Sequence, residues 1–172
     1  MAISRLNHAV LYVRDVARTV AFYRDVLGFS VKHELPSGVG AFLQAPDSTN
    51  DHDLGLFALG AAAADSAAGR STVGMYHLAW ELQTLGELEE HAEKLAAAGA
   101  LVGASDHGTT KSLYAKDPDG LEFSVVWVVP PDLLGDARPS NAGFGSLDIG
   151  REKARYGAET RGGAAVAVPV AD

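Results

Sequence analysis

The chain has 172 residues, a formal charge of −8 at pH 7 and no cysteine, which excludes disulfides, thiolate zinc sites and a cysteine nucleophile. Lysines and arginines do not cluster, so we expect no nucleic-acid partner. No stretch approaches the roughly 20 apolar residues that a membrane span needs, and the N-terminal apolar run is too short for a signal peptide. We therefore expect a soluble cytoplasmic protein with no membrane partner.

Residues 8–28 and 77–99 share one organisation. Each begins with a histidine and a short apolar strand, continues as an amphipathic helix and ends at a glycine, as helices often do. Asp15 is a suitable cap for the first helix, and Thr84 with Glu87 forms a capping box for the second. The apolar stripes of the two helices are Val16, Val20, Tyr23, Leu27 and Leu85, Leu88, Ala92, Leu95.

Three strand-like runs follow each glycine, so the order β-α-β-β-β occurs twice. The runs are residues 29–35, 39–45 and 53–59, then 100–105, 112–117 and 121–127. The pattern predicts an α+β domain over residues 1–129, with modules at about 3–60 and 73–129. The two βαβββ modules are expected to pair into a curved mixed sheet around a shared metal or ligand cavity.

Two segments lie outside this repeat. Residues 60–71, rich in alanine, are typical of a surface linker between the modules. Residues 130–172 are rich in glycine, proline and alanine and show no sustained period. We expect them to form a tail that packs on a neighbouring subunit or stays disordered.

His8 and His77 occupy equivalent positions in the duplicated unit. Side chains alternate along a strand, so His8 shares a face with Val10 and Tyr12, opposite Leu11 and Val13. A lone histidine at a strand start is more often structural, but a matched pair favours a site. By contrast, His33 and His91 lack supporting context, and Lys111 and Lys116 are expected to be solvated charges.

The stretches LNHAVLYV, FYRDVLGF, YHLAWEL and SLYAKDPDG resemble the vicinal oxygen chelate superfamily, which includes glyoxalases, bleomycin-resistance proteins and type I extradiol dioxygenases. The resemblance covers about residues 3–129. Within that superfamily the chain is most similar to the ring-cleaving dioxygenases. Their histidine, apolar-Tyr pair and Asp-Pro-x-Gly turn are matched by His107, Leu113, Tyr114 and the turn at residues 117–120.

The resemblance implies a metal held by two histidines and one carboxylate, Fe(II) or else Mn(II), with a small aromatic substrate and O₂ as partners. His8 and His77 match the histidine ligands. His52 matches the acid–base residue, for which an unperturbed imidazole pKa near 6.5 is suitable. His107 and Tyr114 match residues that hydrogen-bond the substrate oxygens. Relatives are often dimers, so a homodimer is also expected.

The third metal ligand departs from the family pattern. The carboxylate is expected four residues after Gly120, where this chain has Ser124, whereas Glu122 follows by only two. Glu122 and Ser124 share a strand face about 6.6 Å apart. Three outcomes stay open: Glu122 reaches the metal, water completes a two-histidine site, or metal binds weakly. The spacing favours water.

Three functions follow from the resemblance. The first is an extradiol-type dioxygenase that cleaves a catechol-like aromatic with O₂. The second is a non-catalytic binding or sequestration protein of the bleomycin-resistance type, favoured by the loss of a carboxylate at position 124. The third, a glyoxalase-like lyase or isomerase, is disfavoured because such enzymes generally use carboxylates from both modules and the matching first-module strand is expected to supply none.

Overall fold

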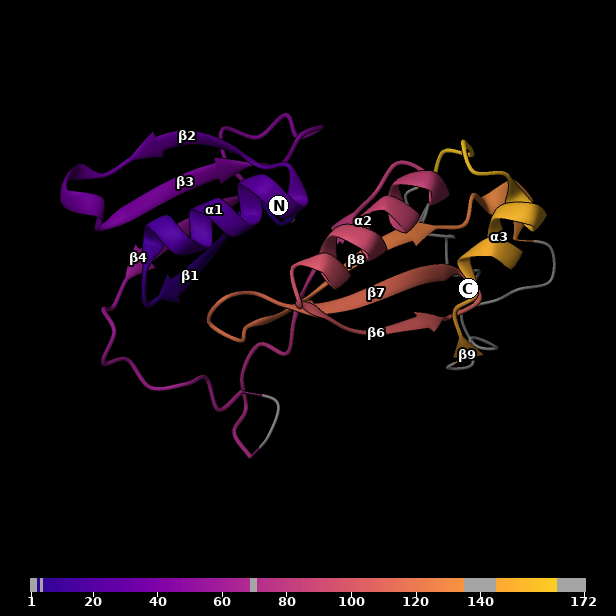
Figure 1. The fold of residues 1–172 in the computed structure, drawn as a ribbon. Helices are drawn as coiled ribbons and strands as arrows, with labels where there is room; N and C mark the ends of the chain where they lie inside the picture. Colours follow the sequence, from indigo (N-terminus) through magenta and orange to yellow (C-terminus); the bar gives the residue numbers. More distant parts are fainter. Residues whose placement is uncertain (1–2, 4, 69–70, 135–144, 164–172) are drawn as a thin grey trace. The chain divides into compact units, whose positions relative to one another are not determined.

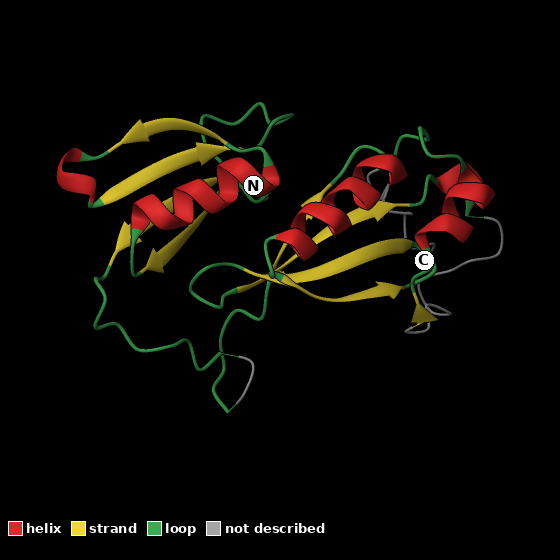
Figure 2. Ribbon diagram, viewed as in Figure 1, coloured by secondary structure: helices red, strands yellow, loops and turns green. Residues whose placement is uncertain are grey.

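The computed structural model describes residues 3, 5–68, 71–134 and 145–163, which divide into two units (Figure 1). Unit 1 comprises residues up to Ala67 together with the turn Asp117–Leu121, and unit 2 comprises Ala68–Lys116 and the described residues from Glu122 onward. Each unit combines a mixed sheet with helices (Figure 2). The α+β fold class expected from the sequence is confirmed.

Unit 1 contains the first β-α-β-β-β series. Its elements are β1 (Ala9–Val13), α1 (Val16–Leu27), β2 (Ser30–Glu34), the short helix η1 (Pro36–Gly38), β3 (Gly40–Gln44) and β4 (Leu54–Ala58). The sheet order is β1-β4-β3-β2, in which β1 and β4 are parallel and the other pairs are antiparallel. The first and last strands of the series therefore lie side by side.

Helix α1 covers one face of this sheet. The Asp15 carboxylate accepts from the backbone N–H of Arg18 at its start, and Gly28 ends it with φ +78°, a conformation that favours glycine. The expected stripe, Val16, Val20, Tyr23 and Leu27, is buried. This stripe packs against the strand side chains that point toward α1. The side chains between them point to the opposite face of the sheet, which is open to a ligand.

Unit 2 repeats the series and extends it. Its elements are β5 (Leu78–Glu81), α2 (Leu85–Ala97), β6 (Leu101–Asp106), β7 (Thr110–Lys116), β8 (Glu122–Val128), the short helix η2 (Pro131–Leu133), β9 (Gly145–Ser146) and α3 (Ile149–Tyr156). The sheet order is β5-β8-β7-β6-β9, again with a parallel first pair. The capping box of Thr84 and Glu87 is present at the start of α2.

The C-terminal segment is expected from the sequence to form a tail that packs on a neighbouring subunit or stays disordered, and part of it instead packs on unit 2. Strand β9 pairs with β6, and α3 lies beside α2 (Figure 1). Trp127 is fully buried, its indole N–H donates to the carbonyl of Thr160 (3.1 Å), and its ring centroid lies 5.5 Å from that of Tyr156. Residues 145–163 are therefore ordered on unit 2, contrary to the expected disorder, whereas packing on a neighbouring subunit stays a prediction. Residues 135–144 and 164–172 lie outside the described residues.

Lys111 is not the solvated charge that the sequence suggested. Its side chain is 1% exposed, and its Nζ lies 2.5 Å from Asp106 Oδ1 and 3.1 Å from Glu152 Oε2. Two carboxylates thus compensate the cost of burying an ammonium group. No local pattern around Lys111 could indicate this, because Glu152 lies 41 residues further along the chain.

No helix in the described ranges is long and apolar enough to cross a membrane.

Candidate functional site

The open face of the unit 1 sheet carries His8. On β1, Val10 and Tyr12 are 50% and 69% exposed, whereas Leu11 and Val13 are buried. Because His8 precedes Val10 by two residues, it belongs to the exposed set, as the alternation predicted. The open face is therefore where unit 1 can offer side chains to a small molecule.

His52 lies beside His8 on this face. Their ring centroids are 4.6 Å apart, and the Phe42 ring lies 4.9 Å from that of His52. His8 Nδ1 is 2.7 Å from Asn7 Oδ1, and His52 Nδ1 is 2.9 Å from Asp51 Oδ2. If each Nδ1 carries the proton, it donates to these oxygens and leaves Nε2 as a basic lone pair, the form that binds a metal or accepts a proton.

Asn50 connects the two segments that carry these histidines. Its Nδ2 donates to the carbonyl of Asn7 (2.8 Å) and to Asp53 Oδ1 (2.8 Å), and its Oδ1 accepts from Arg5 (2.6 Å). One amide thus joins the residues before β1 to the loop before β4. Sequence reasoning missed Asn50, because a loop asparagine carries no signal of such a role.

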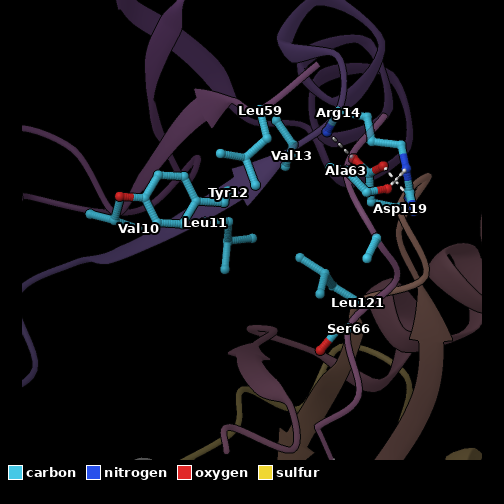
Figure 3. A pocket seen from close by; sticks show the side chains of 11 residues that line it. Val10, Leu11, Tyr12, Val13, Arg14, Leu59, Ala63, Ser66, Asp119 and Leu121 are labelled. Carbon is cyan, nitrogen blue, oxygen red and sulfur yellow. Dashed lines mark hydrogen bonds and ion pairs between the residues drawn. The ribbon is translucent and has the colours of Figure 1, made fainter. Parts of the chain in front are cut away.

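A cavity of about 290 Å³ lies in unit 1 beside β1 (Figure 3). Val10 and Tyr12 line it from β1, Leu59 follows β4, and Leu121 comes from the turn Asp117–Leu121. The lining is mostly apolar, and an ion pair stands at one end of it (Figure 3). A volume of this size suits a small ring or a short chain rather than a large ligand.

The ion pair at this cavity is formed by Arg14 and Asp119. Arg14 Nη1 lies 3.0 Å from Asp119 Oδ1, its backbone N–H donates to Asp119 Oδ2, and its Nη2 lies 2.5 Å from Asp65. The carboxylates of Asp65 and Asp119 raise the pKa of the Arg14 guanidinium. Arg14 was missed in the sequence, since only the fold brings these carboxylates to it.

The open face of the unit 2 sheet carries Tyr114, His107 and His77. The Tyr114 hydroxyl lies 2.8 Å from His107 Nε2, and its ring centroid is 5.9 Å from that of His77. Burial, followed by the nearby Tyr76, raises the pKa of Tyr114, so its hydroxyl stays protonated at neutral pH and can donate. The structure thus brings together three of the four residues that the sequence predicted for this module, the fourth being Glu122.

The sheet register separates the two strand positions compared for the third metal ligand, Ser124 and Glu122. On β8, Ser124 is 1% exposed and pairs with Ala79 on one side and Tyr114 on the other. Phe123 pairs with Leu78. Glu122 is the residue before Phe123, and His77 is the residue before Leu78. Continuing the parallel register sets Glu122 beside His77, with Ser124 one side-chain position further along.

Unit 2 offers side chains of the chemical types that bind a divalent metal. His77 Nδ1 is buried and has no hydrogen-bond partner in the described part of the chain. The Glu122 carboxylate lies 3.6 Å from Lys116 Nζ in a partly exposed ion pair, an interaction weak enough to be exchanged for a metal. Imidazole and carboxylate together suit Fe(II) or Mn(II).

The described side chains do not form a complete metal centre within a unit. No group of three or more histidine, aspartate or glutamate side chains converges among the described residues. His8 and His52 belong to unit 1, and His77, His107, Tyr114 and Glu122 belong to unit 2. The predicted ligand set of His8, His77 and Glu122 draws on both units, so it stays a prediction.

A profile of the Glyoxalase/Bleomycin resistance protein/Dioxygenase superfamily matches residues 5–125. Among curated proteins, the chain is 31% identical over 120 residues to Metapyrocatechase 2 of Cupriavidus necator, covering 67% of this chain and 34% of that protein. It is 33% identical over 117 residues to Biphenyl-2,3-diol 1,2-dioxygenase 3 of Rhodococcus globerulus, covering 67% and 59%. The chain therefore spans one third to three fifths of these relatives.

Solved structures show the same fold at lower identity. A glyoxylase/bleomycin resistance protein/dioxygenase domain from Frankia sp. EAN1pec matches 76% of this chain and 96% of its own, with a TM-score of 0.64 at 18% identity. A point mutant of the fosfomycin resistance protein FosX of Listeria monocytogenes, in complex with Mn(II), matches 72% and 90%, with a TM-score of 0.55 at 24% identity.

Proposed function

The chain belongs to the Glyoxalase/Bleomycin resistance protein/Dioxygenase superfamily, and from this premise we propose that it is a metal-dependent extradiol-type dioxygenase of a catechol-like aromatic. The single observation that carries the proposal is the hydrogen-bonded pair of His107 and Tyr114 beside His77 on one sheet face. The curated relatives named above, a metapyrocatechase and a biphenyl-2,3-diol 1,2-dioxygenase, support the reaction class.

The proposed metal ligands are His8, His77 and Glu122, with Fe(II) ahead of Mn(II). The register argument favours Glu122 over water as the third ligand, a shift from the preference based on sequence spacing. A bound ferrous ion would supply the electron transfer between the aromatic ring and O₂. The protein would supply position and proton transfer.

Three side chains have proposed roles toward the substrate. Tyr114, protonated at neutral pH, donates a hydrogen bond to a catecholate oxygen, and His107 holds the Tyr114 hydroxyl in place. His52 takes or returns the proton of a substrate hydroxyl, helped by the neighbouring carboxylate of Asp51. The rings of Phe42 and Phe57, 5.9 Å apart on the same sheet face as Val10, give an aromatic substrate an apolar contact.

One experiment separates the ligand hypotheses. The protein is loaded anaerobically with Fe(II), its bound iron is quantified, and oxygen uptake is followed with catechol. We expect Glu122→Gln and His77→Ala to lose iron, with affinity lowered at least about tenfold, since each removes a ligand. Ser124→Ala, the matched control on the same strand face, retains it.

Other outcomes select other ligand sets. If Glu122→Gln binds iron as the wild type does, water completes the site instead. If iron is held firmly only after Ser124→Glu, the natural chain lacks a ligand that a carboxylate at position 124 restores.

A non-catalytic binding protein is the second candidate. Its supporting observations are Ser124 at the expected carboxylate position and the engagement of Glu122 with Lys116. Metal-independent binding of an aromatic compound, with no oxygen uptake in any variant, would establish this function and reject the dioxygenase.

A further inference from the structure

The hairpin loop between β6 and β7 carries His107, and Asp106 fixes its shape. The backbone N–H of His107 donates to the Thr110 carbonyl, and that of Thr109 donates to the His107 carbonyl, both at 2.9 Å. Gly108 has φ +76°, and its N–H donates to Asp106 Oδ1 at 2.8 Å. A change in the Asp106 side chain would therefore alter the loop on which His107 lies.

Residues from the C-terminal segment converge on Asp106. Lys111 Nζ bridges Asp106 Oδ1 (2.5 Å) and Glu152 Oε2 of α3 (3.1 Å), the latter as an ion pair without hydrogen-bond geometry. Arg151 of α3 lies 3.6 Å from Asp106 Oδ2, and the backbone of Gly145 on β9 pairs with that of Asp106. Asp106 thus receives two cationic contacts and, from the C-terminal segment, one strand pairing.

Burial strengthens the electrostatic interactions in this cluster. Lys111 and Glu152 are each 1% exposed, so their charges are poorly screened by water. Removing one member would leave the other buried with fewer partners. Lys111 points to the helix-covered face of β7, whereas Tyr114, three residues on, points to the open face. One short strand therefore links the buried ionic cluster to the proposed catalytic pair.

We propose that Glu152 and Lys111 are positioning residues that act through Asp106 to hold residues 106–110 in the conformation in which His107 hydrogen-bonds Tyr114. The proposal rests on the proposed function for what His107 and Tyr114 do. The conformation itself can be measured without metal or substrate. The C-terminal segment then helps to shape the site, in addition to covering Trp127.

The test compares variants that keep the fold with variants that loosen it. The double variant Lys111→Met with Glu152→Leu replaces the buried ion pair by apolar groups of similar size, an exchange that is often neutral or stabilising. Glu152→Ala breaks the pair outright. Lys153→Met is the matched control, because it removes the ion pair of α3 with Glu89 on α2 without contacting Asp106.

The readouts are the melting temperature, the nitrogen NMR signals of the His107 ring in metal-free protein, and the affinity of the iron-loaded protein for catechol. We expect the double variant to keep its melting temperature within a few degrees while His107 loses its hydrogen-bonded signal. Catechol affinity falls about tenfold, since small displacements of positioning groups are costly. Lys153→Met leaves the His107 signals and the catechol affinity unchanged.

Two results would overturn the proposal. Wild-type His107 signals in the double variant would mean that the cluster serves α3 docking alone. Equal perturbation by Lys153→Met would mean that any loosening of α3 has the same effect. If no protein binds catechol while the His107 signals change as expected, the positioning holds and the dioxygenase proposal fails.

Discussion

Asp117 is the first residue of the turn Asp117–Leu121 and is 5% exposed. Its Oδ1 accepts from the backbone N–H groups of Asp119 and Leu121 (2.9 Å each), and these hydrogen bonds shape the turn. Its Oδ2 is buried without a hydrogen-bond partner in the described residues. Burial raises the pKa of Asp117 to about 6, although these backbone donors oppose the shift.

This pKa makes stability depend on pH. The folded state holds the proton more tightly than the unfolded state, whose carboxyl has a pKa of 3.8. The stabilisation is complete below about pH 4 and is lost as the pH rises to about 6, amounting to about 3 kcal/mol for this residue. Asp117→Asn keeps a side-chain oxygen that accepts hydrogen bonds from the backbone N–H groups, and it removes the charge.

We therefore expect Asp117→Asn to flatten the dependence of the unfolding free energy on pH between 4 and 6, and to match or exceed the wild type at pH 7. Urea unfolding at four pH values measures this. Asp25→Asn, an exposed carboxyl on α1, is the control that leaves this dependence in place. Identical slopes for Asp117→Asn and the wild type would contradict the assignment.

At the scale of elements, caps and apolar periodicity predicted α1 and α2 correctly because both signals are local. Asp15, Gly28 and the Thr84–Glu87 box act within a few residues of the helix ends. Helix α3 escaped prediction because its buried residue is the charged Glu152, which long-range partners stabilise. A helix of eight residues that docks through a glutamate shows no apolar stripe.

Helix α3 should be needed for the core of unit 2. We expect a chain ended at Leu134 to lose about 3–5 kcal/mol of unfolding free energy, because it breaks a buried charge cluster and uncovers Trp127. In a Trp80→Phe background, Trp127 emission should shift to longer wavelength. A chain ended at Gly163, which retains α3, is the matched control. Unchanged emission in the shorter chain would show that Trp127 is covered by other groups.

At the scale of the molecule, the sequence predicted the duplicated β-α-β-β-β series but not how its segments are divided between the two units. Position within the repeat identified His8 and His77, and the family resemblance identified Tyr114. The structure sets all three on open sheet faces. It could not assign the turn Asp117–Leu121 to unit 1, because that depends on Arg14 meeting Asp119 across 105 residues.

Arg14 joins three separate segments of unit 1: the end of β1, the linker and this turn. Its Nε donates to the Ala63 carbonyl (3.1 Å), in addition to its pairs with Asp65 and Asp119. We expect Arg14→Met to increase the rate of proteolysis in residues 60–68 roughly fivefold, since cleavage follows the population of the opened linker.

Arg24→Met is the control for this variant, because Arg24 is an exposed arginine paired only locally with Asp25 in the described contacts. Limited digestion followed by mass spectrometry locates the cuts. Equal cleavage of the two variants would show that Arg14 does not restrain the linker.

The assignment of residues 117–121 to unit 1 also bears on the order of folding during synthesis. Domains generally fold from the N-terminus as the chain leaves the ribosome. Here the N-terminal unit lacks one of its segments until residue 121 has emerged, by which time most of the second series has also been made. Unit 2 in turn needs Thr160 to cover Trp127. An unfinished first unit therefore persists on the nascent chain until residue 121 has been added, and the second unit stays incomplete until Thr160 has been added.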